Sequence, residues 1–102
     1  MAPEFTNNEV EERYEVHQDG QLVGVAYYRI MDDNIAFIHT VTAPEVAGQG
    51  VGSQLARYAL DDVRDNSTRR VLPLCPFIRG WITRHPEYKE LTRRKTNTQV
   101  RL

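Results

Sequence analysis

Three segments in the first half of the chain have the apolar patterning of β-strands. They cover residues 12–17, 22–30 and 35–41. Asp19-Gly20 and residues 31–34 separate them, and connections this short join strands in antiparallel order. The third segment is apolar on both faces, which is typical of a strand in the interior of a sheet. We therefore expect an antiparallel meander with the third strand in a central position.

After residue 50 the apolar positions change to helical spacing, which predicts an amphipathic helix that ends near Asn66-Ser67. Its apolar face consists of Val51, Leu55, Ala56, Ala59, Leu60 and Val63. Residues 70–74 predict a fourth strand, which a right-handed helical crossover places parallel to the third. Pro73 cannot donate to a β-ladder, so we expect it at a sheet edge or where two strands part.

Pro76 is suited to open a short helix over residues 77–84, and His85-Pro86 ends it. Together the elements predict an α/β (α+β) fold, in which a twisted mixed sheet contains an antiparallel meander, a β-α-β crossover and a short C-terminal helix. Residues 1–9 and about 90–102 are polar without periodicity, so we expect them to be poorly ordered. The chain has no repeat or linker, and 102 residues predict a single domain over 1–102.

Glycines alternate at positions 48, 50 and 52, between the third strand and the long helix. A glycine-rich loop at a helix start exposes backbone N–H groups beside the positive end of the helix dipole, which suits a phosphate ligand. The spacing is neither that of a P-loop, because no Lys-Ser or Lys-Thr follows, nor that of a dinucleotide-binding loop. The alternative interpretation is a flexible loop before a surface helix.

Two side chains are candidates for chemistry. Cys75 ends the fourth strand just before Pro76, and a helix start favours the thiolate. His39 lies near the end of the neighbouring parallel strand, at the edge where α/β sheets carry their sites. A His39–Cys75 pair could relay an acyl group, with the imidazole as base. Alternatively, Cys75 is a small buried hydrophobe, and His39 is a core histidine in phase with Ile35 and Phe37.

Composition excludes several classes of function. The chain is 40% hydrophobic and 26% charged, as in ordinary soluble domains, and it has no apolar stretch that would span a membrane. Its single cysteine excludes an internal disulfide and fits a reducing cytoplasm. The three histidines are too scattered in sequence to indicate a metal site.

The net charge of −1 conceals a division between the two halves of the chain. Residues 1–51 carry 2 basic against 9 acidic residues, a balance of −7, and residues 52–102 carry 11 against 5, a balance of +6. A basic half suits a ligand with several phosphates, although it is also compatible with an ordinary solvated surface. The basic residues lack interleaved aromatic residues and a recognition motif, so nucleic acid is not the expected partner.

The glycine loop resembles the acetyl-CoA loop of the GNAT acetyltransferases, whose usual form is Arg/Gln-x-x-Gly-x-Gly. Gly50 and Gly52 match its last two glycines, and Ala47 stands where the family has Arg or Gln. His39-Thr40 and the segments 73–77 (Pro-Leu-Cys-Pro-Phe) and 84–88 (Arg-His-Pro-Glu-Tyr) extend the likeness to a group of minimal, single-domain GNAT-like proteins. The resemblance covers roughly residues 12–90.

This resemblance implies a GNAT-like fold, acetyl-CoA or CoA as the bound cofactor, and catalytic roles for His39 and Cys75. The cofactor-binding residues that it implies are Val41, Gly48, Gln49, Gly50, Val51, Gly52 and Ser53. The backbone N–H near Val41 would polarise the thioester oxygen. The tyrosine that often protonates the leaving thiolate has no clear match, although Trp81 is near its place.

The implied reaction is transfer of an acetyl group from acetyl-CoA to an amine, either directly or through an acyl-Cys75 intermediate. The alternative is a CoA-binding module or sensor without efficient turnover. The chain is shorter than ordinary GNAT enzymes and lacks the elements that shape their acceptor site. We therefore expect a small-molecule acyl-CoA as partner and an acceptor that the sequence does not identify. The expected assembly is a monomer or weak dimer.

Overall fold

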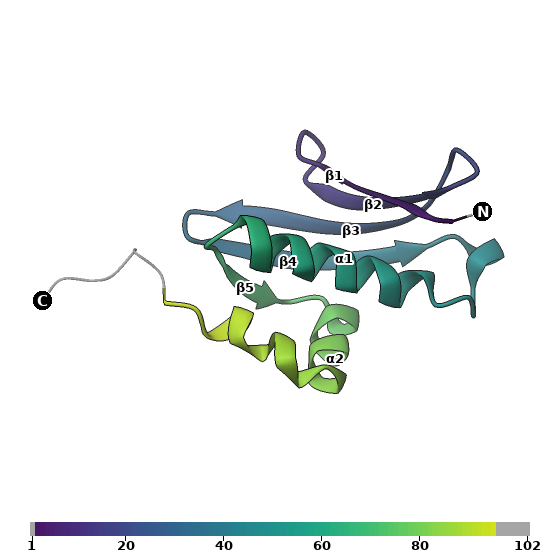
Figure 1. Cartoon of the computed structure of the whole chain (residues 1–102). Helices are drawn as coiled ribbons and strands as arrows, with labels where there is room; N and C mark the ends of the chain where they lie inside the picture. Colours follow the sequence, from purple (N-terminus) through teal and green to yellow (C-terminus); the bar gives the residue numbers. More distant parts are fainter. Residues whose placement is uncertain (1, 96–102) are drawn as a thin grey trace, which may run out of the picture.

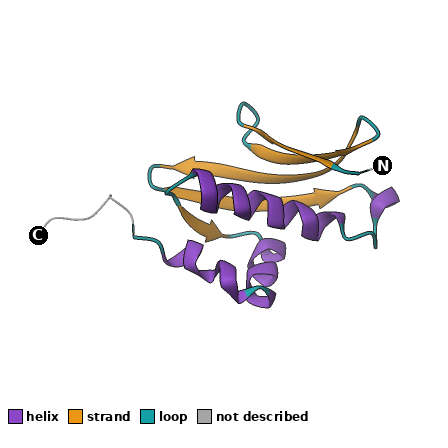
Figure 2. Cartoon of the chain, in the orientation of Figure 1, coloured by secondary structure: helices purple, strands orange, loops and turns teal. Residues whose placement is uncertain are grey.

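A computed structural model describes residues 2–95, which form a five-stranded mixed sheet with helices along it (Figures 1 and 2). The elements are β1 (Glu4–Asn8), β2 (Arg13–Gln18), β3 (Gln21–Met31), β4 (Asn34–Thr42), η1 (Pro44–Val46), α1 (Val51–Asn66), β5 (Arg70–Pro73), α2 (Pro76–Arg84) and η2 (Pro86–Arg93). The strands lie in the order β1-β2-β3-β4-β5, and only the β4–β5 pair is parallel. The predicted meander, crossover and C-terminal helix are confirmed.

The prediction that residues 1–9 are poorly ordered is wrong for β1. This strand pairs antiparallel with β2 over all of Glu4–Asn8. Its register is supported by an aromatic contact, because the ring of Phe5 stacks on Tyr58 of α1 at 5.2 Å between centroids. The segment is short and mostly polar, so its alternation was too weak to indicate a strand. The sheet therefore has one more strand than the sequence predicts.

The expectation of poor order over about residues 90–102 is wrong for its first part. η2 continues to Arg93, and both Tyr88 and Leu91 are buried against the rest of the core. Residues 96–102 lie outside the part of the chain that the structure describes.

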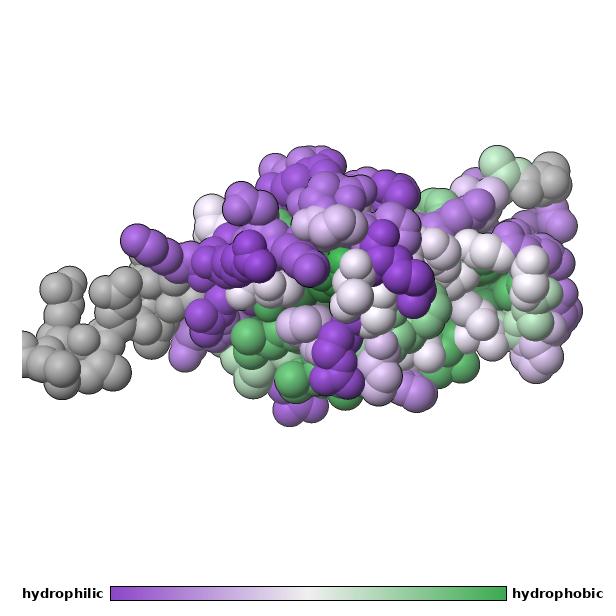
Figure 3. All heavy atoms as spheres, turned by 90° about the horizontal axis from the view of Figure 1, so that it is seen from below, coloured by the Kyte–Doolittle hydropathy of each residue, from purple (hydrophilic) through white to green (hydrophobic). Residues whose placement is uncertain are grey.

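The core lies between the helices and one face of the sheet. All six apolar positions predicted for α1 are buried, and they join residues from β2 to β5, α2 and η2 in one cluster. Seen from the α2 side, apolar residues at the surface lie in separate patches among hydrophilic ones (Figure 3). No helix within residues 2–95 is long and apolar enough to cross a membrane.

β4 contains an extra residue that reverses its side-chain alternation. Tyr28 lies opposite Phe37, but the preceding Tyr27 lies opposite His39, so Ile38 is a bulge. Before the bulge Phe37 faces the helices, and after it Thr40 does. His39 consequently points to the face away from α1 and is exposed. The prediction that His39 is in phase with Phe37 is therefore wrong.

Candidate functional site

The site begins where β4 and β5 part. Their parallel pairing extends only to Phe37 and Pro73, and the backbone N–H of Cys75 then donates to the Phe37 carbonyl at 2.8 Å. β4 itself continues to Thr42. Within residues 2–95, no strand pairs with this last part of β4 on the β5 side. Pro73 thus lies where two strands part, which is one of the two positions that the sequence predicted for it.

Backbone groups of two threonines are directed into this gap. Ala43 donates its N–H to Val23 at 2.8 Å, so its peptide group is directed toward β3. Because successive residues of a strand direct their backbone groups to opposite sides, those of Thr42 and Thr40 are directed toward the gap. The gap therefore offers peptide donors and acceptors of the kind that a neighbouring strand or an amide-containing ligand can pair with.

The gap opens into a cavity of about 330 Å³ that reaches the start of α1. The residues lining it are Thr40, Thr42, Val46, Ala47, Gly48, Gly50, Val51, Gly52, Ser53, Phe77 and Arg84. The predicted glycine loop and the gap therefore belong to one cavity.

The loop has the conformation that the alternating glycines predict. Gly48 and Gly50 have φ angles of +81° and +77°, in the left-handed region that favours glycine. No side chain caps α1, so the N–H groups of Val51, Gly52 and Ser53 in its first turn have no acceptor among the described residues. A Cβ added at Gly50 would meet nothing within 4 Å, so the space in front of these donors is open.

Gly52 allows close packing at the start of α1. A Cβ at this position would lie 3.2 Å from the ring of Phe77 in α2 and 3.5 Å from the methyl group of Thr42 in β4. The absence of a side chain thus brings both helices and the end of β4 together around the cavity.

Ser53 contributes its backbone N–H to the cavity, while its hydroxyl is used inside the protein. The indole N–H of Trp81 donates to Ser53 Oγ at 2.8 Å. Trp81 is fully buried and stacks on His85 at 3.8 Å between ring centroids. Trp81 therefore anchors the start of α1 to α2, a role that the sequence did not indicate.

Two predicted cofactor-binding residues do not line the cavity. The backbone N–H of Gln49 donates to Val46 at 3.1 Å, and its side chain donates to the Glu45 carbonyl at 3.3 Å. Val41 lies opposite Val25, with its peptide group directed toward β3 and its side chain exposed. Their places in the cavity are taken by Thr40 and Thr42 of β4. The sequence could not indicate these threonines as cavity residues, because it does not reveal the bulge that sets their direction.

The predicted His39–Cys75 pair is not formed. The Cys75 thiol is 2% exposed, and its sulfur lies 3.4 Å from Thr40 Oγ1 on the helix side of β4. His39 lies opposite Tyr27 on the other face of the sheet. Cys75 therefore has the surroundings of the buried hydrophobe that was its alternative interpretation, and His39 is not a core histidine.

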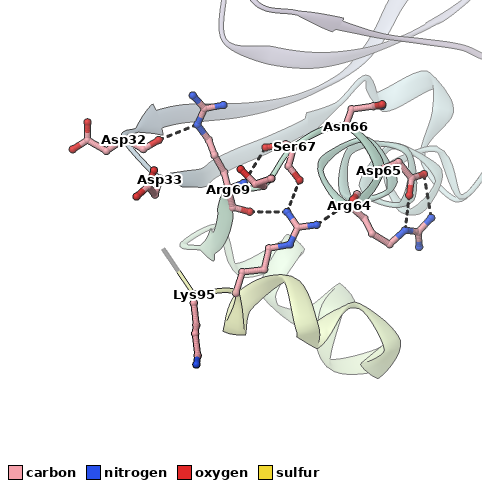
Figure 4. A pocket seen from close by; sticks show the side chains of 10 residues that line it. Asp32, Asp33, Arg64, Asp65, Asn66, Ser67, Arg69 and Lys95 are labelled. Atoms are coloured by element: carbon pink, nitrogen blue, oxygen red, sulfur yellow. Dashed lines mark hydrogen bonds and ion pairs between the residues drawn. The ribbon is translucent and has the colours of Figure 1, made fainter. Parts of the chain in front are cut away.

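A larger polar groove of about 840 Å³ lies at the other end of α1 (Figure 4). Its central side chain is Arg94, which donates to the carbonyls of Val63, Arg64, Ser67 and Arg69 at 2.7 to 3.4 Å. The Arg69 side chain in turn donates to the Asp32 carbonyl at 3.0 Å. These contacts supply donors to backbone carbonyls at the C-terminal end of α1. The polar residues of this groove are therefore explained by their role in stabilising the end of the helix. Among residues 2–95, no cluster of His, Cys, Asp or Glu could hold a metal ion.

Residues 13–91 match a family model described as GCN5-related N-acetyl-transferase. The chain belongs to this family. No curated protein matches the chain. Among solved structures, it resembles ribosomal-protein-alanine N-acetyltransferase from Brucella melitensis biovar Abortus 2308, with a TM-score of 0.55 and 14% identity. The likeness covers 88% of this chain and 66% of that chain. At this identity the neighbour supports the GNAT fold, and the predicted fold and family resemblance are confirmed.

Proposed function

We propose that this GNAT-family chain is an N-acetyltransferase whose donor, acetyl-CoA, binds in the cavity between the β4–β5 gap and the start of α1. The main support for this proposal is that two sets of backbone groups line one cavity. The first is a row of free N–H groups at Val51, Gly52 and Ser53, and the second is the pair of backbone groups at Thr40 and Thr42.

The two features suit different parts of the donor. Backbone donors at a helix start bind phosphate, and the left-handed turn at Gly50 opens the space that a pyrophosphate needs. The peptide groups of Thr40 and Thr42 suit the amides of the pantetheine arm, which can pair with β4 as a strand does. In this arrangement Gly48 is needed for the loop conformation, and Gln49 shapes the loop from outside the cavity.

Bound acetyl-CoA supplies an acetyl group already activated as a thioester. In direct transfer the amine nitrogen forms a bond to the acetyl carbon, the carbon–sulfur bond breaks, and the amine proton leaves as the CoA sulfur gains one. A peptide N–H in the gap, at Thr40 or Thr42, is placed to polarise the acetyl oxygen. We assign His39, exposed on the opposite face next to the bulge, as the base for an amine that approaches from that face.

The binding site is tested by replacing Gly50 with Val and measuring acetyl-CoA affinity by calorimetry. A β-branched residue at a φ of +77° is strained by about 1–3 kcal/mol, so the loop should change and affinity should fall at least about tenfold. Gly20→Val is the matched control. Gly20 has a φ of +78° and equally open surroundings, but it lies in the β2–β3 turn. A folded Gly50→Val protein that binds as well as wild type would reject the site.

The second candidate function is acetyl-CoA binding without efficient turnover. It is favoured by the lining of the cavity, which among the described residues contains no titratable side chain except that of Arg84. The two functions differ in thiol release. An enzyme releases CoA thiol faster when amines are added to bound acetyl-CoA, whereas a binding module or sensor does not.

A further inference from the structure

We propose that Arg84 is the side-chain ligand of the donor's pyrophosphate, acting with the backbone N–H groups at the start of α1. This inference deepens the proposed function and rests on it. It assigns a specific phosphate-binding role to the last residue of α2, a helix that is separate from the glycine loop.

The position of Arg84 follows from the face that α2 presents to the cavity. Phe77, Gly80 and Arg84 follow one another at helical spacing, and the first and last line the cavity. Arg84 Nη1 lies 3.4 Å from the place of a Cβ on Gly80. The guanidinium therefore lies back along α2, toward Phe77, whose ring is next to Gly52 at the start of α1.

Gly80 allows this arrangement. Glycine inside a helix is less favourable than alanine, and this glycine has no left-handed φ that would require it. The Arg84 guanidinium rests on the helix surface at this glycine, at about ordinary van der Waals distance from the place of a Cβ.

The charge of Arg84 is available to a ligand. Among the described residues that line the cavity, no other is charged. Several other arginines of the described chain are held by protein partners, for example Arg57 by the Tyr88 hydroxyl and Arg64 by Asp61 and Asp65. Within residues 2–95, the Arg84 guanidinium has no hydrogen-bond acceptor or ion-pair partner. A free guanidinium fork that lines the same cavity as the backbone donors of α1 is suited to bidentate binding of phosphate oxygens.

The test compares wild type with Arg84→Gln and Arg84→Lys, using CoA and dephospho-CoA as probes in calorimetry. Dephospho-CoA lacks the 3′-phosphate and keeps the pyrophosphate. Comparing it with CoA therefore shows which of these two groups Arg84 binds. Arg79→Gln is the matched control, because Arg79 is also exposed on α2 but does not line the cavity. Circular dichroism verifies that each variant is folded.

We expect Arg84→Gln to weaken both probes by the same factor, roughly tenfold to a hundredfold, since charged hydrogen bonds are lost. Arg84→Lys should recover part of the affinity, and Arg79→Gln should bind as wild type. Equal affinity of Arg84→Gln and wild type would overturn the inference while leaving the proposed function intact. A loss confined to CoA would also overturn it, because the 3′-phosphate would then be the target. If wild type binds neither probe, the proposed function itself is rejected.

Discussion

The bulge residue Ile38 determines which side chains of β4 line the cavity between the β4–β5 gap and the start of α1. Its bulge turns Thr40 toward Cys75 and His39 toward the opposite face. The sequence marks His39 and Cys75 as unusual residues, and it places both at the correct end of the sheet. The pair was expected because both residues lie at the carboxyl ends of adjacent parallel strands, and the sequence does not reveal the extra residue that turns His39 to the opposite face.

This geometry predicts the route of the acetyl group, which two variants distinguish. His39→Ala should lower the rate of acetyl transfer by about a hundredfold or more, as expected for loss of a general base, with little change in acetyl-CoA affinity. Cys75→Ala, in protein shown to be folded, should retain most of the rate, because the thiol is buried on the other face. Both rates are measured as CoA thiol release in the presence of an amine.

The relay through an acyl-Cys75 intermediate predicts the opposite result. Cys75→Ala would then be at least as damaging as His39→Ala. An acetyl group removable by hydroxylamine would also appear on Cys75 after incubation with acetyl-CoA. Either finding would contradict direct transfer.

At the scale of single elements, the two ends of α1 differ in whether their backbone groups have partners within the protein. Its first turn has N–H groups without an acceptor among the described residues, whereas carbonyls of its last turn accept hydrogen bonds from the Arg94 guanidinium. The extent of α1 was predictable, because its apolar residues recur at helical spacing over the whole element. The closure by Arg94 was not, because it comes from a residue about 30 positions further along the chain.

Replacing Arg94 should therefore affect stability and not ligand binding. Arg94→Gln should lower the free energy of unfolding by about 1–3 kcal/mol, since it removes charged hydrogen bonds to helix carbonyls and a cation from the negative end of the helix dipole. Urea denaturation measures the change. The neighbouring Arg93→Gln, at an exposed position, is the control and should stay within about 0.5 kcal/mol of wild type. Weaker acetyl-CoA binding by folded Arg94→Gln would contradict this separation of roles.

At the scale of the whole molecule, the helices cover one face of the sheet and leave residues such as His39 and Val41 of the other face exposed (Figure 1). The order of strands from β2 onward was predictable from short turns and the crossover helix. β1 was not, because its few polar residues are ordered by contacts made only after folding.

The excess of basic residues in the second half of the chain places few charges at the candidate site. The second half carries 11 basic residues against 5 acidic ones, but several of the arginines, including Arg57, Arg64 and Arg94, bind groups of the protein itself. Among the described residues that line the cavity, Arg84 alone has a charged side chain. The attraction of a phosphate ligand to the basic half of the chain therefore stays a prediction, and one arginine of that half lies at the cavity.

Binding of acetyl-CoA between the β4–β5 gap and the start of α1 is best tested by titrating isotope-labelled protein with CoA and following the backbone amide shifts by NMR. We expect saturable shifts that are largest at the N–H groups of Val51, Gly52, Ser53 and Thr42, with little change at Arg69 in the polar groove. Binding at this site is rejected if the largest shifts lie in that groove, or if no saturable shift occurs at the start of α1.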